Sequence, residues 1–99
     1  MKIQISGKQT DVNEALQDRV QTRLPAALNK YFEGGMDAHV VFSRTRAAFR
    51  ADCTLHLDTG TVLKSEGEAD DAIHAFESAL SHLEKQVRRH MRRLKNHHA

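Results

Sequence analysis

Residues 73–95 read IHAFESALSHLEKQVRRHMRRLK, a stretch in which apolar residues recur every three or four positions. An α-helix advances by about 100° per residue, so this spacing places the apolar residues on one face of a helix. They are Ile73, Phe76, Leu80, Leu83, Val87, Met91 and Leu94. Basic residues centre on the opposite face, and these are Lys85, Arg88, Arg89, Arg92, Arg93 and Lys95. We therefore expect one long helix that packs on a core along one side and presents an anion-binding cationic stripe along the other.

The net charge of +2 conceals a separation of charge along the chain. Residues 82–99 contain six Lys/Arg and one Glu, a net of +5, whereas residues 1–81 contain nine Lys/Arg and twelve Asp/Glu, a net of −3. Most cations of the last helix are arginines, whose planar guanidinium groups fit phosphate oxygens in bidentate fashion. The stripe therefore indicates a nucleic-acid partner, with a merely solvated helix face as the alternative on composition alone.

Length and composition restrict the class of protein. Ninety-nine residues, 39% of them hydrophobic, suffice for one folded domain with a single core. The sequence has no run of about 18 apolar residues and no apolar stretch behind Met1 and Lys2, so we expect no membrane partner and no secretory signal. The single cysteine, Cys53, cannot form an internal disulfide, which favours a reducing, cytoplasmic setting.

The rest of the chain predicts four strands and one further helix. Alternating apolar residues predict the strands, which cover residues 2–6, 38–43, 49–58 and 61–67. Asp11, with Glu14 three residues later, is expected to cap a helix over residues 12–32, which Pro25 should bend without dividing it. Asp70 or Asp71 should cap the final helix.

The predicted order is β-α-β-β-β-α, which indicates an α+β fold. Because each helix has one apolar stripe and the strands alternate, we expect a four-stranded sheet with both helices packed side by side on one face. Arg19, Arg23 and Lys30 fall on one line beside the apolar stripe of the first helix. They should therefore join the cationic stripe of the final helix in one basic surface.

Short segments along nearly the whole chain match one known family. They are SGKQ at 6–9, DVNEAL at 11–16, KYF at 30–32, Asp71-Ala72 followed by Ala75-Phe76, and LEKQVRR at 83–89. In this order, and with strands and helices of fitting length, they resemble the ribosome hibernation promoting factors. That family includes the ribosome-associated inhibitor A type and was formerly known as the sigma-54 modulation proteins.

The resemblance implies a domain shaped like double-stranded RNA-binding domains, and a non-enzymatic role without cofactor, metal or small-molecule substrate. Members bind the small ribosomal subunit and the 70S ribosome through 16S rRNA, in the channel for mRNA and tRNA. They thereby inhibit translation by occupancy in stationary phase or stress.

The family also implies which residues bind RNA, because basic positions of both its helices face 16S rRNA. Arg23, Lys85 and Arg89 match such positions, and His82 stands where relatives often have lysine. Together with the cations predicted above, the candidate RNA-binding residues are Arg19, Arg23, Lys30, His82, Lys85, Arg88, Arg89, Arg92, Arg93 and Lys95.

Two features depart from the family pattern. Many relatives have an aromatic residue two positions after the capping aspartate, where this chain has Ile73, so we expect a core role and no base stacking there. The ending RRHMRRLKNHH at 88–98 resembles the junction of long members, which continue into a C-terminal dimerisation domain. We expect a ribosome-binding domain over residues 1–95 and a tail or the start of a linker over 96–99, in either a short form or a truncated long one.

Other reactive residues give weaker signals. Cys53 lies on the apolar face of its predicted strand, which favours a buried, inert thiol over a nucleophile. Asp52 and His56, with His39 nearby, share an outward strand face and resemble an acid/base or metal cluster, but exposed residues of this kind are usually only solvated. Three histidines lie near the C-terminus: His90, His97 and His98. They could bind a metal ion weakly, but a frayed polar chain end is the favoured interpretation.

Three classes of function remain, in decreasing order of support. The first is an rRNA-binding translation inhibitor, the second a general double-stranded RNA- or DNA-binding module, and the third a small nuclease that uses His39, Asp52 and His56.

Overall fold

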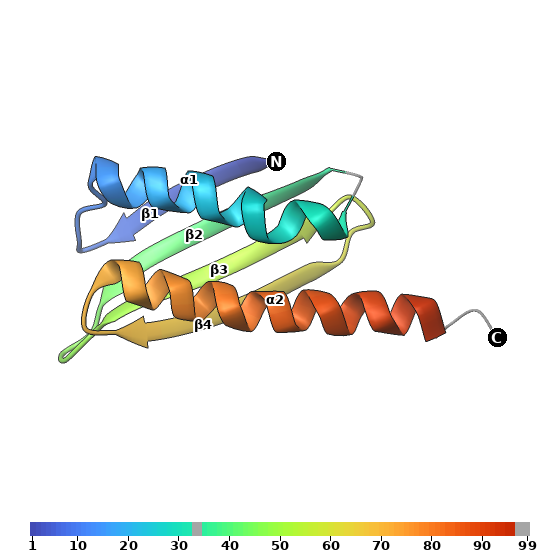
Figure 1. The fold of residues 1–99 in the computed structure, drawn as a ribbon. Helices are drawn as coiled ribbons and strands as arrows, with labels where there is room; N and C mark the ends of the chain where they lie inside the picture. Colours follow the sequence, from blue (N-terminus) through green and yellow to red (C-terminus); the bar gives the residue numbers. More distant parts are fainter. Residues whose placement is uncertain (33–34, 97–99) are drawn as a thin grey trace.

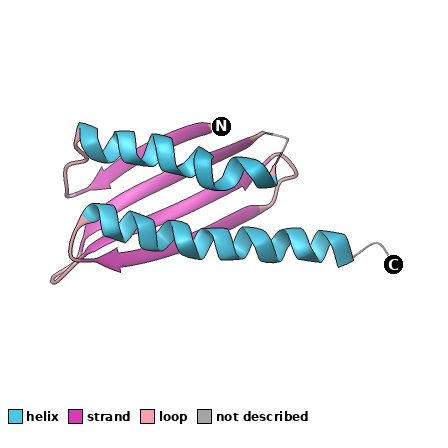
Figure 2. Ribbon diagram, in the orientation of Figure 1, coloured by secondary structure: helices cyan, strands magenta, loops and turns pink. Residues whose placement is uncertain are grey.

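The computed structural model describes residues 1–32 and 35–96 and has one sheet covered by two helices (Figure 1). The elements in chain order are β1 (Lys2–Lys8), α1 (Glu14–Leu28), the short 3₁₀ helix η1 (Asn29–Tyr31), β2 (Met36–Arg44), β3 (Phe49–Leu57), β4 (Val62–Ala69) and α2 (Ala72–Asn96). The strands lie in the order β1-β2-β3-β4, with β1 parallel to β2 and the other neighbours antiparallel. Both helices cover the same face of the sheet (Figure 2), which confirms the predicted α+β fold.

The core lies between this face and the helices, because the central strands alternate as their sequences predict. Val40 and Phe42 of β2 are buried, and in register they face Cys53 and Ala51 of β3, which are also buried. From α2, Phe76 packs with its ring centroid 6.4 Å from that of Phe42. The outward positions of the same strands are more exposed, so only one face of the sheet contributes to the core.

The first helix begins later than the sequence pattern indicates. Its capping residue is Asn13 and not Asp11, since the Asn13 side chain accepts a hydrogen bond of 2.8 Å from the backbone N–H of Leu16. Pro25 lies inside α1 without dividing it, and the carbonyl of Pro25 accepts the N–H of Asn29. The chain then tightens into η1, so the predicted helix over 12–32 is in fact an α-helix followed by one 3₁₀ turn.

The last helix is capped by Asp71, whose carboxylate accepts a 2.7 Å hydrogen bond from the backbone N–H of His74. Two of its predicted apolar residues are exposed: Ile73 in the first turn is 38% exposed, which contradicts the core role expected for it, and Leu94 near the end is 50% exposed. The 25 residues of α2 span about 37 Å, whereas the 8 residues of β4 span only about 27 Å. The C-terminal end of α2 therefore runs past the sheet (Figure 1) and carries its cations away from the core.

The helix α2 lies almost directly on the edge strand β4 at Gly67. A Cβ atom added at Gly67 would lie 2.4 Å from the backbone nitrogen of Ala79 and 2.5 Å from the carbonyl oxygen of Ala75. Close by, the Ser65 hydroxyl donates a 2.7 Å hydrogen bond to the carbonyl of Ala79. These contacts fix the distance between α2 and the sheet.

Candidate nucleic-acid interface

The basic residues of the first helix lie beside α2, as their spacing predicts, but they meet a carboxylate there. Arg19 Nε and Arg23 Nε lie 3.3 Å and 3.1 Å from Glu77 Oε1, and Arg23 Nη2 lies 3.2 Å from Glu77 Oε2. This hydrogen-bonded pairing raises the pKa of Arg23 and lowers the pKa of Glu77. Two cations of the predicted surface are thus partly neutralised, and they also tie α1 to α2.

A hollow of about 260 Å³ opens next to this ion pair, between the two helices. Arg23 and Arg88 line it together with Glu77 and Glu84. Arg23 and Arg88, predicted to belong to one surface, are therefore brought together by the fold. The hollow is thus lined by as many carboxylates as guanidinium groups, so its lining residues carry no net charge.

A second hollow, of about 350 Å³, lies between η1 and the part of α2 that follows Val87, and we call it the η1–α2 hollow. It is lined by Lys30, Tyr31, Arg88, Met91 and Arg92. The Nζ atom of Lys30 lies 5.2 Å from the centroid of the Tyr31 ring. Lys30 was predicted to lie in the first α-helix, but it belongs to η1. It still lies beside the cations of α2.

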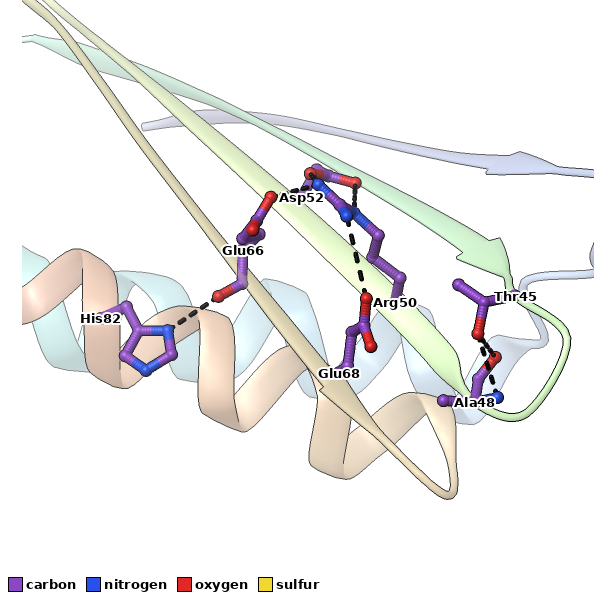
Figure 3. Close-up of polar contacts among 7 residues, drawn as sticks. All are labelled: Thr45, Ala48, Arg50, Asp52, Glu66, Glu68 and His82. Carbon is purple, nitrogen blue, oxygen red and sulfur yellow. Dashed lines mark hydrogen bonds and ion pairs between the residues drawn. The ribbon is translucent and has the colours of Figure 1, made fainter.

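The remaining candidates of α2 are divided between its two flanks. Successive residues are separated by about 100°, so Arg89 and Arg93 are turned away from Arg88 and Arg92 towards the β4 side of the helix. On that side His82 Nδ1 lies 2.7 Å from the carbonyl oxygen of Glu66 (Figure 3). Lys85, Arg88, Arg89, Arg92 and Arg93 are all exposed. Lys95 continues α2, and its side chain lies outside the described part of the structure.

The possible acid/base cluster on the open face of the sheet does not converge. Arg50 pairs with Asp52 at 3.1 Å, with Glu66, and with Glu68 at 3.8 Å (Figure 3). Asp52 and His56 are four residues apart on one strand, about 14 Å, so their side chains are too distant to share a proton or a ligand. His39 instead lies 3.0 Å from the hydroxyl of Ser6, through Nε2.

Two other candidates for chemistry are also accounted for by the fold. Cys53 is buried in the core, and burial raises the pKa of its thiol to about 12, so it is protonated near neutral pH. Within residues 1–32 and 35–96, no group of three His, Cys, Asp or Glu side chains is placed to hold a metal ion. His90 lies on α2, whereas His97 and His98 fall outside the described residues.

Sequence reasoning missed two residues of this region. Glu77 was not assigned any role, although its carboxylate links both helices. Tyr31 entered only as part of the KYF segment at 30–32 and was given no role in binding, whereas it lines the η1–α2 hollow. A signal existed for Tyr31, since it directly follows the candidate Lys30 in the sequence.

Within the part of the chain that the structure describes, no helix is both long enough and apolar enough to cross a membrane.

Comparison with known proteins points to one group of relatives. A family model described as sigma 54 modulation protein / S30EA ribosomal protein matches residues 3–95. The chain is 39% identical over 98 residues to the ribosome hibernation promotion factor of Rhizobium meliloti (strain 1021), covering 99% of the chain and 52% of that protein. It is 32% identical over 97 residues to the ribosome hibernation promoting factor of Salmonella typhimurium, covering 98% of the chain and 100% of that protein. The chain thus spans about half the length of the Rhizobium relative and the full length of the Salmonella one.

Solved structures show the same fold. The N-terminal domain of Thermus thermophilus Protein Y superposes with a TM-score of 0.80 at 30% sequence identity, covering 90% of this chain and 98% of that domain. A ribosomal subunit interface protein from Coxiella burnetii superposes with a TM-score of 0.75 at 21% sequence identity, covering 91% of this chain and 97% of that protein. The second likeness concerns the fold alone.

Proposed function

The chain belongs to the sigma 54 modulation protein / S30EA ribosomal protein family, and we propose that it binds the ribosome and inhibits translation as a hibernation factor. The observation that carries this proposal is the family match itself. It covers residues 3–95, and therefore all of the described strands and helices except Lys2 at the start of β1 and Asn96 at the end of α2. The names of the relatives denote ribosome-associated factors and not enzymes.

The finer proposal concerns where and how the protein binds. We propose that it occupies the mRNA and tRNA channel of the small subunit and contacts 16S rRNA in free subunits and in 70S ribosomes. The charge distribution supports this, because the end of α2 carries exposed arginines away from the core, where they are free to approach a phosphate backbone. The proposed contacts come from Arg19, Arg23, Lys30, His82, Lys85, Arg88, Arg89, Arg92, Arg93 and Lys95.

Residues 1–95 form the proposed ribosome-binding unit, followed by a tail or linker over 96–99. We propose that it acts on ribosomes in the cytoplasm, in stationary phase or under stress. Inhibition by occupancy needs only binding, so the amount of inhibitor should match the amount of ribosomes. The inhibition should be reversed by high salt and relieved by competing mRNA or initiator tRNA.

The test is a purified translation reaction to which the protein is added in increasing amounts. We expect inhibition to be complete near one protein per ribosome, with 16S rRNA intact on a denaturing gel. Excess duplex RNA should not restore translation. Restoration by duplex RNA would favour a general double-stranded nucleic-acid-binding module instead. Substoichiometric inhibition with a defined 16S cleavage product would favour a nuclease.

A further inference from the structure

The η1–α2 hollow differs chemically from the rest of the basic surface. Tyr31 and Met91 give it an aromatic and apolar part, and Lys30, Arg88 and Arg92 stand around them. The described residues that line it thus carry three positive charges and no carboxylate, and one of the three, Arg88, also lines the neighbouring hollow. The neighbouring hollow at Arg23 contains two carboxylates, so phosphate is favoured at the η1–α2 hollow over its neighbour.

The dimensions of the hollow match a small ligand. Its volume of about 350 Å³ is at the lower end of the range of about 300 to 1,000 Å³ that is usual for ligand pockets. An RNA duplex is far too large, and its stacked bases present no ring face to a side chain. An unpaired nucleotide combines an aromatic base with an adjacent phosphate, which is the combination that these five residues complement.

We propose that the η1–α2 hollow holds one unpaired nucleotide of an RNA strand, its base stacked on Tyr31 against Met91 and its phosphate paired with Lys30, Arg88 and Arg92. The proposal rests on the proposed function and names the kind of RNA element that this part of the surface selects. It makes Tyr31 a determinant of binding to single-stranded RNA.

The contact between Lys30 and Tyr31 shows how the hollow accommodates such a nucleotide. The Lys30 ammonium group lies over the Tyr31 ring, at 5.2 Å from its centroid. An entering nucleotide replaces this contact with two others, because the base takes the ring face while the phosphate pairs with the ammonium group. Lysine is suited to this exchange, since its charge sits on a long flexible stem.

The first experiment measures the affinity of the protein for a fluorescein-labelled decauridine by anisotropy. Tyr31→Leu removes the ring, and Tyr31→Phe is the matched control that keeps it. We expect Tyr31→Leu to bind about tenfold more weakly, in line with the usual loss of one base–aromatic stack, and Tyr31→Phe to bind normally. Equal affinities for all three proteins, or equal losses in both variants, would overturn the proposal.

A second pair of variants tests the phosphate contact. Arg92→Gln changes a residue of the hollow, and Arg93→Gln removes the same charge on the other flank of α2. We expect Arg92→Gln to weaken decauridine binding more than Arg93→Gln does, and an equal effect would contradict the assignment. Free uridine monophosphate should compete only weakly, because a strand supplies further phosphates. Competition as strong as that of the decauridine would overturn the assignment to an RNA strand.

Tyr31 packs partly against the core, so Tyr31→Leu requires a readout that does not depend on that variant. Decauridine that contains 5-iodouridine should photo-crosslink to Tyr31 of the unaltered protein, as mapped by mass spectrometry. Crosslinks confined to other residues would refute the pocket. Sedimentation with small subunits separates this outcome from the function proposed above. If the unaltered protein cosediments but Tyr31 is neither crosslinked nor needed for affinity, the pocket is wrong and the ribosomal function stands.

Discussion

Replacing Gly67 by alanine should push α2 away from the sheet. The added methyl carbon would lie 2.4 Å from the nitrogen of Ala79, 2.5 Å from the oxygen of Ala75 and 2.8 Å from the Cβ atom of Ser78. Two of these three neighbours are backbone atoms of α2, which cannot rotate away as a side chain would. Gly67 has no left-handed backbone angle, so strain in the φ angle does not contribute to the effect.

The size of the effect follows from these distances. Comfortable contacts of a methyl group need about 3.5 Å or more, so α2 must move by about 1 Å. Overpacking of a core usually costs about 1 to 3 kcal/mol, and the rigid backbone neighbours place Gly67→Ala at about 2 to 3 kcal/mol. For a domain of this size each kcal/mol lowers Tm by about 4 to 8 °C. The expected loss is therefore about 10 to 20 °C in Tm.

Thermal unfolding followed by circular dichroism measures this loss, with Gly35→Ala as the matched control. A Cβ atom at Gly35 meets nothing within 4 Å, and its backbone angle is not left-handed. Gly35→Ala should leave Tm unchanged or raise it slightly, because alanine restricts the unfolded chain. If Gly67→Ala melts like Gly35→Ala, the close packing of α2 on β4 is wrong.

Three further predictions concern the core, the ion pair between the helices and the thiol. Phe76→Ala should lower the free energy of unfolding by about 3 to 5 kcal/mol in urea titrations, and an unchanged midpoint would contradict its burial. Glu77→Gln should increase RNA affinity, because it releases Arg19 and Arg23 from their ion pairs. The loss of these pairs should lower the free energy of unfolding by less than about 1 kcal/mol. A weaker RNA affinity of this variant would argue against Arg19 and Arg23 as RNA contacts. The pKa of Glu77 is lowered in the folded state, so its pairing stabilises the fold above the unfolded pKa and is lost as the pH falls through the folded pKa. The stabilities of the two proteins should therefore converge in acid. Cys53, with its pKa raised to about 12, should react with an aromatic disulfide reagent only as fast as the protein opens, and rapid labelling would show an exposed thiolate.

The sequence predicts the elements well because their patterns are local. The alternation around Val40 and Cys53 depends only on the period of a strand, and the spacing from Phe76 to Val87 only on that of a helix. The same patterns do not say where the sheet ends. Leu94 continues the apolar spacing but lies beyond the sheet, so the prediction that it is buried was wrong.

Helix ends and contacts between helices are harder to predict, for a different reason. Asp11 and Asn13 are both good capping residues, and the structure selects Asn13, whose backbone is extended and whose side chain accepts the N–H of Leu16. The placement of Arg23 beside α2 follows from helix periodicity. Its pairing with Glu77 depends on how the two helices slide past each other, which neither helix encodes alone.

The central claim is that the arginines of α2 bind the ribosome, and sedimentation with purified small subunits tests it most directly. The variant replaces Arg88, Arg89, Arg92 and Arg93 by Gln, and a control of equal charge change replaces Lys2, Lys8, Arg46 and Lys64 by Gln. Each lost phosphate contact should reduce the slope of log affinity against log salt by about one. We predict that the unaltered protein and the control cosediment with subunits at low salt, whereas the arginine variant remains at the top of the gradient with an unchanged melting curve. Normal cosedimentation of the arginine variant would contradict the account and leave the stripe as a solvated helix face.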